Sequence, residues 1–337
     1  MPFAVCHAGP MLRIGILGAA GIAPNAIIIP ARRRDDVEIV AVASRSESSA
    51  SAYAATHSIP RSYGGYERLL ADPEIDLIYN ALPPSEHSRW SIAALESGKN
   101  VLCEKPFAMS ADEARLMTTA ATDTGLRLIE AFHDRYHPLS AEIDRIVASG
   151  RLGEIVSAHA DFTASIPFDP ASIRHDPAVG GGSLMDLGCY PLHQLRAVMA
   201  SEPEVLDATA TVNSMGADLS MDASLRFTSG VTARMTCSMV DGAELNSSLD
   251  VVGTLGSLHV DNLVFPSKGH TISETRDGIT RNSTVAGLET YDHQLAAVVE
   301  GLASGERLLT EGVDSVAQMQ AIDAIYASAG FDRAALR

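Results

Sequence analysis

Residues 11–23 read MLRIGILGAAGIA: a short apolar run, a turn bounded by glycines, and the start of a helical pattern. The apolar run predicts a buried strand over residues 11–17. A strand, a glycine turn and a helix form the context in which a dinucleotide pyrophosphate meets a helix N-terminus. In the usual pattern, G-x-G-x-x-G/A, Ala20 here replaces the second glycine and Ala23 supplies the third small residue. An ordinary strand-to-helix turn is the alternative interpretation.

We expect cofactor contacts from the residues of this turn, which are Gly18, Ala19, Ala20, Gly21 and Ile22. An alanine methyl at position 20 narrows the approach to the pyrophosphate without blocking it. Two prolines follow. Pro24 suits a first helical turn, whereas Pro30 is expected to end or kink the helix before Ala31.

Strand-like and helical stretches alternate from here to residue 131. Further strands are predicted over residues 37–43, 76–80, 100–103 and 127–131. Helices are predicted over residues 48–56, 66–71, 111–124 and around 90–97, and Ser110 is expected to cap the helix that follows it. Such alternation is typical of a parallel, doubly wound sheet with right-handed crossovers. We therefore assign residues 1–131 to a Rossmann domain that binds NAD(P).

The strand exits of this half carry polar residues that suit such a cofactor. An NAD-binding unit usually has Asp or Glu after its second strand, but this chain has Ser44 and Arg45. A hydroxyl and an arginine suit a 2′-phosphate, so we predict NADP(H) in preference to NAD(H), with a solvated arginine as the alternative. At the next exit, cofactor contacts are expected from Asn80, Leu82, Pro83 and His87. For His87, a purely structural role is the alternative.

Residues 102–107 read LCEKPF, so a strand ends in a carboxylate, an ammonium and a proline. Because the α region is disfavoured before proline, Lys105 is expected to stay extended at the carboxyl end of a strand. That end of an open α/β sheet is where ligands bind. Glu104 and Lys105 are therefore candidate cofactor contacts, with an ordinary surface lysine as the alternative.

After residue 131 the pattern changes from alternating strands and helices to mostly strands. A polar connector over residues 132–137 precedes a helix that Pro138 opens and that runs to Ser149. Strands are predicted over residues 154–162, 205–211, 220–227, 231–238, 247–252 and 256–261, and helices over 291–304 and 311–329. Alternation of apolar and polar residues between Ala223 and Phe227 predicts one packed and one solvated face. We interpret residues 132–337 as an α+β domain built on one large antiparallel sheet.

A helix with a mixed polar face interrupts these strands. Three glycines precede it, and Asp186, Tyr190 and His193 fall at i, i+4 and i+7, on one helical face. A solvated polar stripe is the alternative, but the glycines and the mixture of acid, phenol and imidazole favour a binding site. Pro191 removes the helical partner of the Leu187 carbonyl, so a local distortion is expected.

The composition excludes several kinds of partner. With 25 basic and 42 acidic residues the formal net charge is −17, which argues against nucleic acid and anionic membranes. The four cysteines lack metal-binding spacing, so we predict no metal site and expect a reduced, cytoplasmic setting. No apolar run approaches the ~20 residues that span a bilayer, and residues 1–10 lack the layout of a signal peptide.

Together these motifs resemble the glucose–fructose oxidoreductase / inositol dehydrogenase (Gfo/Idh/MocA) family. The resemblance covers essentially the whole chain and rests on the glycine turn, Asn80 with its proline turn, Glu104-Lys105-Pro106, and the glycines before Asp186 and Tyr190. It implies a Rossmann domain followed by a substrate-binding domain with an open, mainly antiparallel sheet. It also implies a homodimer or homotetramer formed through that sheet, and nicotinamide-dependent chemistry on sugars, polyols or related diols.

Within the family, inositol dehydrogenase-like members carry histidine four residues after the aspartate. Tyr190 at that position is similar to glucose–fructose oxidoreductase, dimeric dihydrodiol dehydrogenase and NADP-dependent xylose dehydrogenase. Two other functions on this fold stay open as alternatives: a regulator that binds cofactor without turnover, and an NAD-dependent glycosidase.

The expected chemistry needs a group that exchanges the proton of the substrate hydroxyl. We assign this role to Tyr190, with Lys105 beside it to lower the pKa of the phenol, or with Lys105 as the proton carrier. Asp186 is expected to orient the hydroxyl or the lysine. His193 and Arg174 are expected substrate contacts, and a structural role is the alternative for His193.

Overall fold

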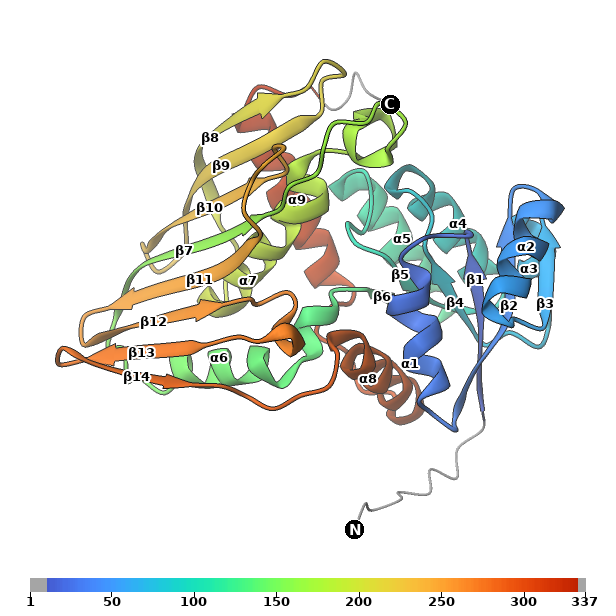
Figure 1. The fold of residues 1–337 in the computed structure, drawn as a ribbon, viewed down its shortest axis with the longest axis horizontal. Helices are drawn as coiled ribbons and strands as arrows, with labels where there is room; N and C mark the ends of the chain where they lie inside the picture. Colours follow the sequence, from blue (N-terminus) through green and yellow to red (C-terminus); the bar gives the residue numbers. More distant parts are fainter. Residues whose placement is uncertain (1–10, 333–337) are drawn as a thin grey trace, which may run out of the picture.

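The structure is a computed structural model that describes residues 11–332. The predictions for residues 1–10, and for Cys6 among the cysteines, lie outside the described residues. Two sheets organise the chain, and they stand side by side with helices between them (Figure 1). No helix of residues 11–332 is long and apolar enough to cross a membrane.

The first sheet has six parallel strands in the order β3-β2-β1-β4-β5-β6. Its strands are β1 (Leu12–Leu17), β2 (Val37–Ser44), β3 (Arg61–Gly64), β4 (Leu77–Asn80), β5 (Asn100–Cys103) and β6 (Leu128–Glu130). The doubly wound Rossmann arrangement is thus confirmed. Only β3 was not predicted, because its four residues, RSYG, are half-buried and carry no apolar run.

The helices of this half are α1 (Ile29–Arg32), α2 (Glu47–His57), α3 (Tyr66–Leu70), α4 (Pro84–Glu96) and α5 (Ala111–Thr124). The Ser110 hydroxyl accepts the Glu113 N–H and caps α5 as predicted. The start of α4 was predicted too late. It begins at Pro84 because proline is pre-organised for a first helical turn, where its missing N–H has no partner to lose, and His87 therefore lies inside the helix.

Both prolines that fall inside a helix follow a π-helical turn. The turn η1 (Pro24–Ile28) leads into α1, and η5 (Leu184–Gly188) leads into α7 (Cys189–Met199). Of the two outcomes expected at Pro30, an end of the helix is wrong, because the helix continues to Arg32. The wider π-helical turn before Pro30 is a local distortion that absorbs the missing bond. The distortion expected near Pro191 is confirmed as η5.

The second sheet has eight strands in the order β14-β13-β12-β11-β7-β10-β9-β8. They are β7 (Ile155–Thr163), β8 (Glu204–Val212), β9 (Asp218–Arg226), β10 (Thr232–Ser238), β11 (Asn246–Gly253), β12 (Gly256–Asp261), β13 (Ile272–Arg276) and β14 (Ile279–Ser283). All pairs are antiparallel except β7 with β10, so the prediction of a mainly antiparallel sheet is confirmed. The parallel pair arises because a long connection containing α7 separates β7 from the β8–β9–β10 meander.

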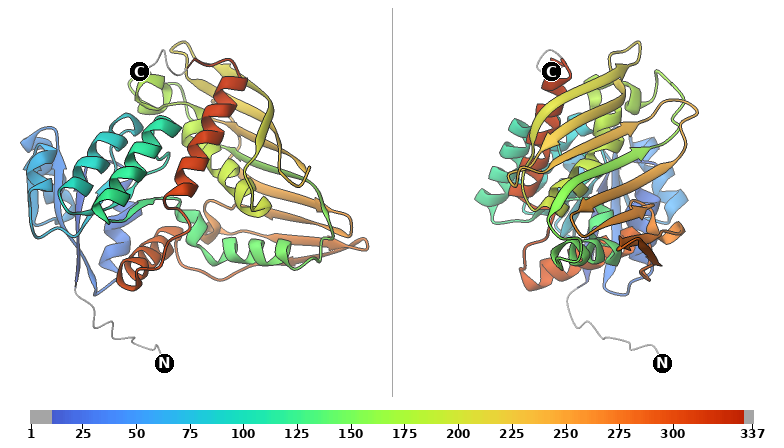
Figure 2. Two further views of the ribbon diagram at one scale, coloured as in Figure 1. Left: turned by 180° about the vertical axis from the view of Figure 1, so that it is seen from behind. Right: turned by 90° about the vertical axis from the view of Figure 1, so that its left-hand side faces the viewer.

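One face of this sheet packs on helices and the other does not. Ala223 and Leu225 of β9 are buried, whereas Ser224 and Arg226 are exposed, as the alternation predicted. The helices α6 (Pro138–Ala148), α7 and α9 (Val313–Ser328) lie on the inner side, toward the first domain. Figure 2 shows the opposite face, on which no helix of residues 11–332 lies.

The helix α8 (Thr290–Ser304) returns from the second half of the chain to the first domain, where it lies beside α1 (Figure 1). Its residues Leu295 and Val298 are fully buried in one cluster with Ile14 of β1 and Leu77 of β4. Arg127, just before β6, pairs with Glu311, just before α9, with 2.6 Å between the guanidinium and the carboxylate. Parts of residues 132–337 therefore complete the core of the first domain.

Candidate active site

Lys105 lies where β5 ends, in a loop that neighbouring strands hold in place. The Glu104 N–H donates to the Asn80 carbonyl at the end of β4, and the Phe107 N–H donates to the Glu130 carboxylate at the end of β6. Because parallel strands end at the same edge of a sheet, these bonds fix Lys105 at the ligand-binding edge, as the sequence predicted.

The Lys105 ammonium reaches the second domain. Its Nζ donates to the Asp186 carbonyl oxygen at 2.6 Å and to Asp186 Oδ1 at 3.0 Å. The other carboxylate oxygen, Oδ2, accepts a bond from Arg174 Nε at 2.7 Å. Asp186 thus holds both cations, and Lys105 and Asp186 are mostly buried while Arg174 is half-exposed.

Opposite charges decide the protonation states of this group. Burial disfavours charge on Lys105, but Asp186 together with Cys189 and Glu104 outweighs it and raises the Lys105 pKa above its usual value. Burial likewise disfavours ionised Asp186, but Lys105 and then Arg174 lower the Asp186 pKa. At neutral pH the ammonium and the carboxylate are both charged, and Asp186 orients the lysine.

Tyr190 lies beneath this ion pair. The Lys105 Nζ is 5.0 Å from the centre of the Tyr190 ring, so the ammonium meets the face of the ring and not its hydroxyl. Burial raises the pKa of Tyr190 well above its usual range. The structure therefore does not support the expectation that Lys105 lowers the Tyr190 pKa, because burial raises it.

The Tyr190 hydroxyl has a different partner. It lies 2.9 Å from His133 Nε2, and the Tyr190 ring packs edge-on against Phe132 and Phe162 with centroids 5.6 Å apart in both cases. His133 was not predicted as a site residue. The only sequence signal was the density of polar groups in the connector after β6, which gave no role to any single residue.

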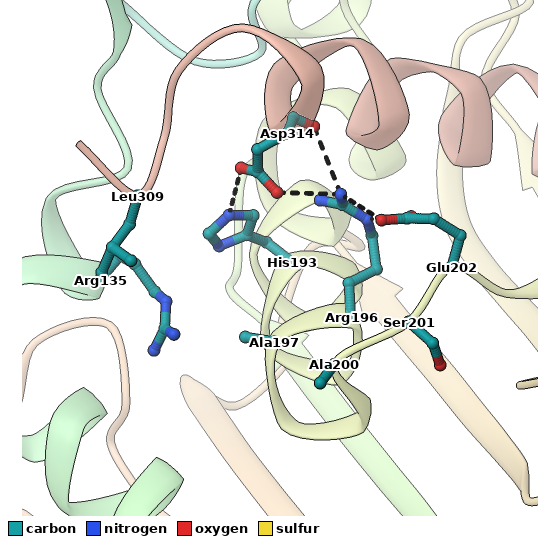
Figure 3. Close-up of a pocket in the computed structure, with 9 residues that line it drawn as sticks. All are labelled: Arg135, His193, Arg196, Ala197, Ala200, Ser201, Glu202, Leu309 and Asp314. Carbon is teal, nitrogen blue, oxygen red and sulfur yellow. Dashed lines mark hydrogen bonds and ion pairs between the residues drawn. The ribbon is translucent and has the colours of Figure 1, made fainter. Parts of the chain in front are cut away.

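His193 does not join this group. Its ring stacks on Phe132 at 4.3 Å, and its Nε2 lies 3.1 Å from Asp314 Oδ2. His193 and Asp314 line a separate cavity of about 260 Å³ with Arg196 and Arg135 (Figure 3). Tyr190 and His193 both pack on Phe132, but the pairing of His193 with Asp314 favours the structural alternative for this histidine.

The cofactor edge lies at the carboxyl ends of β1 and β2. Gly18 has φ of +99°, and a Cβ there would lie 3.1 Å from Leu82 Cδ2 and 3.3 Å from the Ala81 carbonyl oxygen, so the turn requires glycine. Ala19, Gly21 and Ile22 are exposed, and Ala20 is half-buried. At the neighbouring exit Ser44 is half-buried and Arg45 is exposed. The exposed turn fits a pyrophosphate, and the arginine fits a phosphate beside it.

Other predicted cofactor contacts are buried and hold loops. Both ring nitrogens of His87 face carbonyl oxygens, Nε2 that of Leu82 at 2.7 Å and Nδ1 that of Pro106 at 3.0 Å. Burial lowers the His87 pKa to about 4. Asn80 is fully buried, and its Oδ1 accepts the Leu82 N–H. His87 and Asn80 therefore connect the loop after β4 to the loop that carries Lys105.

Glu104 is also buried, and its Oε1 accepts a hydrogen bond from the Tyr79 hydroxyl. Burial raises the Glu104 pKa. Leu82 is buried and Pro83 half-buried at the same edge. Residues 11–332 hold no group of three or more His, Cys, Asp or Glu that could bind a metal ion, and their three cysteines are buried and free.

Comparisons with known proteins agree with this architecture. Residues 12–132 match the model of an oxidoreductase family with an NAD-binding Rossmann fold, and residues 140–259 match the GFO/IDH/MocA C-terminal domain. An NADP⁺-dependent D-xylose 1-dehydrogenase of Haloferax volcanii is 37% identical over 94% of this chain and 97% of its own length. A trans-1,2-dihydrobenzene-1,2-diol dehydrogenase of Danio rerio is 35% identical over 74% of each chain.

Among solved structures, a 3-ketoreductase of Actinomadura kijaniata in complex with NADP and TDP-benzene superposes with a TM-score of 0.88 at 26% identity, covering 95% of this chain and 98% of that one. The fold and the edge that Lys105 occupies define an oxidoreductase that binds a nicotinamide dinucleotide. The chain belongs to the GFO/IDH/MocA family, which confirms the resemblance found in the sequence.

Proposed function

We propose that this protein transfers hydride between NADP(H) and a CH–OH or C=O carbon of a sugar, polyol or related diol, with Lys105 and Tyr190 as the proton-exchange pair. The observation that carries the proposal is the convergence of Lys105 from the first domain with Asp186 and Tyr190 from the second, at the edge where the exposed glycine turn lies. The printed activities of the relatives, on D-xylose and on a dihydrodiol, support the substrate class.

When bound, the nicotinamide supplies the hydride donor or acceptor. The chain's own residues manage the proton and the charge. Tyr190 is protonated at neutral pH, so its hydroxyl donates to the oxygen of a carbonyl substrate. The Lys105 ammonium stabilises negative charge on that oxygen, and Asp186 keeps the ammonium oriented.

The preference for NADP(H) over NAD(H) is part of the proposal. It rests on Ser44 and Arg45 at the end of β2, where an acidic residue would repel a 2′-phosphate. The NADP named for the xylose dehydrogenase relative and for the 3-ketoreductase structure supports the same choice.

Homo-oligomer formation through the large sheet is proposed as well. Its outer face carries cross-strand polar pairs, such as Asp222 with Arg234 and Asp250 with His259, which offer charged and hydrogen-bonding groups to a second copy. Light scattering coupled to size exclusion is expected to give the mass of a dimer or tetramer. A monomer at micromolar concentration overturns this part alone.

The function is tested by mixing the protein with NADP⁺ and a panel of aldoses, polyols and trans-dihydrodiols, and measuring the absorbance of reduced cofactor. We expect turnover with at least one member of the panel. Two results together overturn the enzymatic proposal in favour of a regulator. The protein binds NADP(H) tightly, and it turns over neither the panel with NADP⁺ nor the corresponding ketones with NADPH.

A further inference from the structure

His133 connects the Tyr190 hydroxyl to a third part of the chain. It lies in the 3₁₀ turn η2 (His133–Tyr136) that follows β6. Its Nε2 is 2.9 Å from Tyr190 Oη of α7, and its Nδ1 is 2.7 Å from Thr290 Oγ1, at the start of α8. Both His133 and Thr290 are buried. The Tyr291 ring lies against the imidazole, with ring centroids 4.1 Å apart.

The imidazole is neutral in these surroundings. Burial, and then the nearby charge of Lys105, lower the His133 pKa to about 3. A neutral imidazole carries one N–H, so one ring nitrogen donates and the other accepts. Its two hydrogen bonds are therefore coupled, and the tautomer of His133 decides the direction of both.

The two tautomers present Tyr190 differently to a substrate. With the proton on Nδ1, His133 donates to Thr290 Oγ1 and accepts the Tyr190 hydroxyl hydrogen, which leaves only Tyr190 oxygen lone pairs for the substrate. With the proton on Nε2, His133 donates to Tyr190 Oη, and the Tyr190 hydrogen is free to point at the substrate oxygen. The first arrangement accepts a bond from a substrate alcohol, and the second donates one to a substrate carbonyl.

We propose that His133 is a positioning residue that sets, through its tautomer and its bond to Thr290, whether the Tyr190 hydroxyl faces the substrate as an acceptor or as a donor. The inference deepens the proposed function and rests on it for its kinetic readout. The scheme concerns only the direction of two hydrogen bonds: each tautomer carries one ring proton, and neither arrangement forms or breaks a bond to the substrate.

Two conservative variants separate the two bonds. His133→Gln places an amide nitrogen near the position of Nε2 and keeps a partner for Tyr190, whereas His133→Asn places one near Nδ1 and keeps a partner only for Thr290. His133→Leu removes both. Removing one hydrogen bond from the reacting hydroxyl is expected to lower kcat about tenfold in His133→Leu and His133→Asn, with KM nearly unchanged, and His133→Gln is expected to recover most of it.

A role through Tyr190 is distinguished from a structural one by a double-mutant cycle. In a Tyr190→Phe background, His133→Leu is expected to cause no further loss of kcat. The same tenfold loss in both backgrounds, or an effect on KM alone, overturns the proposal. Thr290→Val is expected to lower kcat by less than His133→Asn does. Thr290→Ser keeps the hydroxyl and is expected to have the kcat of the wild type.

A measurement without substrate keeps this inference separate from the proposed function. In protein labelled with ¹⁵N-histidine, the ring nitrogen signals of His133, assigned by their loss in His133→Gln, report the tautomer directly. They are expected to shift in both Tyr190→Phe and Thr290→Val. Unchanged signals contradict the inference even in an active enzyme. Shifted signals in a protein that turns over no substrate overturn the proposed function instead, and with it the kinetic role of His133.

Discussion

Arg45 is exposed at the carboxyl end of β2, where we propose that the 2′-phosphate of NADP(H) binds. A guanidinium forms charge-assisted bonds with a phosphate that a plain 2′-hydroxyl cannot match. We expect Arg45→Ala to raise the Kd of NADPH by ~10-fold or more and to change the Kd of NADH by less than ~2-fold. Fluorescence titration with both cofactors measures this, with Arg281→Ala, exposed on β14, as the matched control. Equal losses for the two cofactors contradict the assignment.

Glu130, at the end of β6, gives a second prediction for a single residue. Its burial, and then the charge of Asp314, raise its pKa from 4.5 to about 8. The folded protein keeps this proton where the unfolded chain has released it, so the stability from this group is full below about pH 4.5 and falls as pH rises toward 8. Glu130→Gln keeps a neutral group of similar size and should remove that fall.

Urea unfolding at about pH 6 and about pH 8.5 checks this prediction. Between those pH values, the free energy of unfolding of the wild type is expected to fall by on the order of 2 kcal/mol more than that of Glu130→Gln. Equal pH dependence in the two proteins shows that Glu130 is ionised when folded.

Helices and strands were predicted best where neighbouring residues alone determine the backbone conformation. The strand before Lys105 was predicted over residues 100–103, as observed, because an apolar run ends at a residue that proline keeps extended. The strands β13 and β14 were missed because their residues are mostly polar and exposed, and only pairing with β12 makes them strands. At Pro30 the alternative that the helix ends was wrong because a π-helical turn before the proline lets the helix continue, as the turn before Pro191 does.

In the loop before α8, histidine rings accept hydrogen bonds from the backbone. His270 and His293 accept the backbone N–H groups of Val285 and Leu288, and His137 accepts that of Leu139. Burial, and then the neighbouring histidines, lower the His137 pKa to about 4. A histidine whose folded pKa is depressed stabilises the fold above about pH 6.5, and this stability is lost as pH falls toward 4.

We therefore expect the free energy of unfolding to fall by on the order of 2 kcal/mol between about pH 6.5 and about pH 4 on account of His137. His137→Asn offers an acceptor that does not titrate, and its decline over this range should be shallower. Chemical denaturation across the pH series measures both proteins. A parallel decline in the two shows that other groups cause the acid sensitivity.

At the scale of the whole molecule, the two domains share elements, which the sequence did not indicate. A division at residue 131 follows the change in pattern, but α8 lies on the first domain and buries Leu295 completely. Lys105 and Asp186 meet across the same division. The position of α8 and the contact between Lys105 and Asp186 depend on how the two domains pack against each other. The spacing of apolar residues along the sequence carries no information about that packing.

Because α8 belongs to both halves, we expect Leu295→Ala to lower stability by about 2–5 kcal/mol and both domains to unfold in one transition. Calorimetry and urea unfolding followed by circular dichroism measure this. Leu288→Ala, 65% exposed in the preceding loop, is the matched control and should change little. Separate transitions for the two sheets contradict a shared core.

The central claim is that Lys105 and Tyr190 together exchange the substrate proton at the cofactor edge. The most direct test measures kcat with NADP⁺ and an alcohol substrate, together with the Kd of NADPH, in Lys105→Met and Tyr190→Phe. Tyr63→Phe, in β3 at the far edge of the first sheet, is the matched control. We predict that kcat falls ~10²–10⁴-fold in each site variant while the Kd of NADPH stays within ~3-fold of the wild type. Normal turnover in either site variant contradicts the claim.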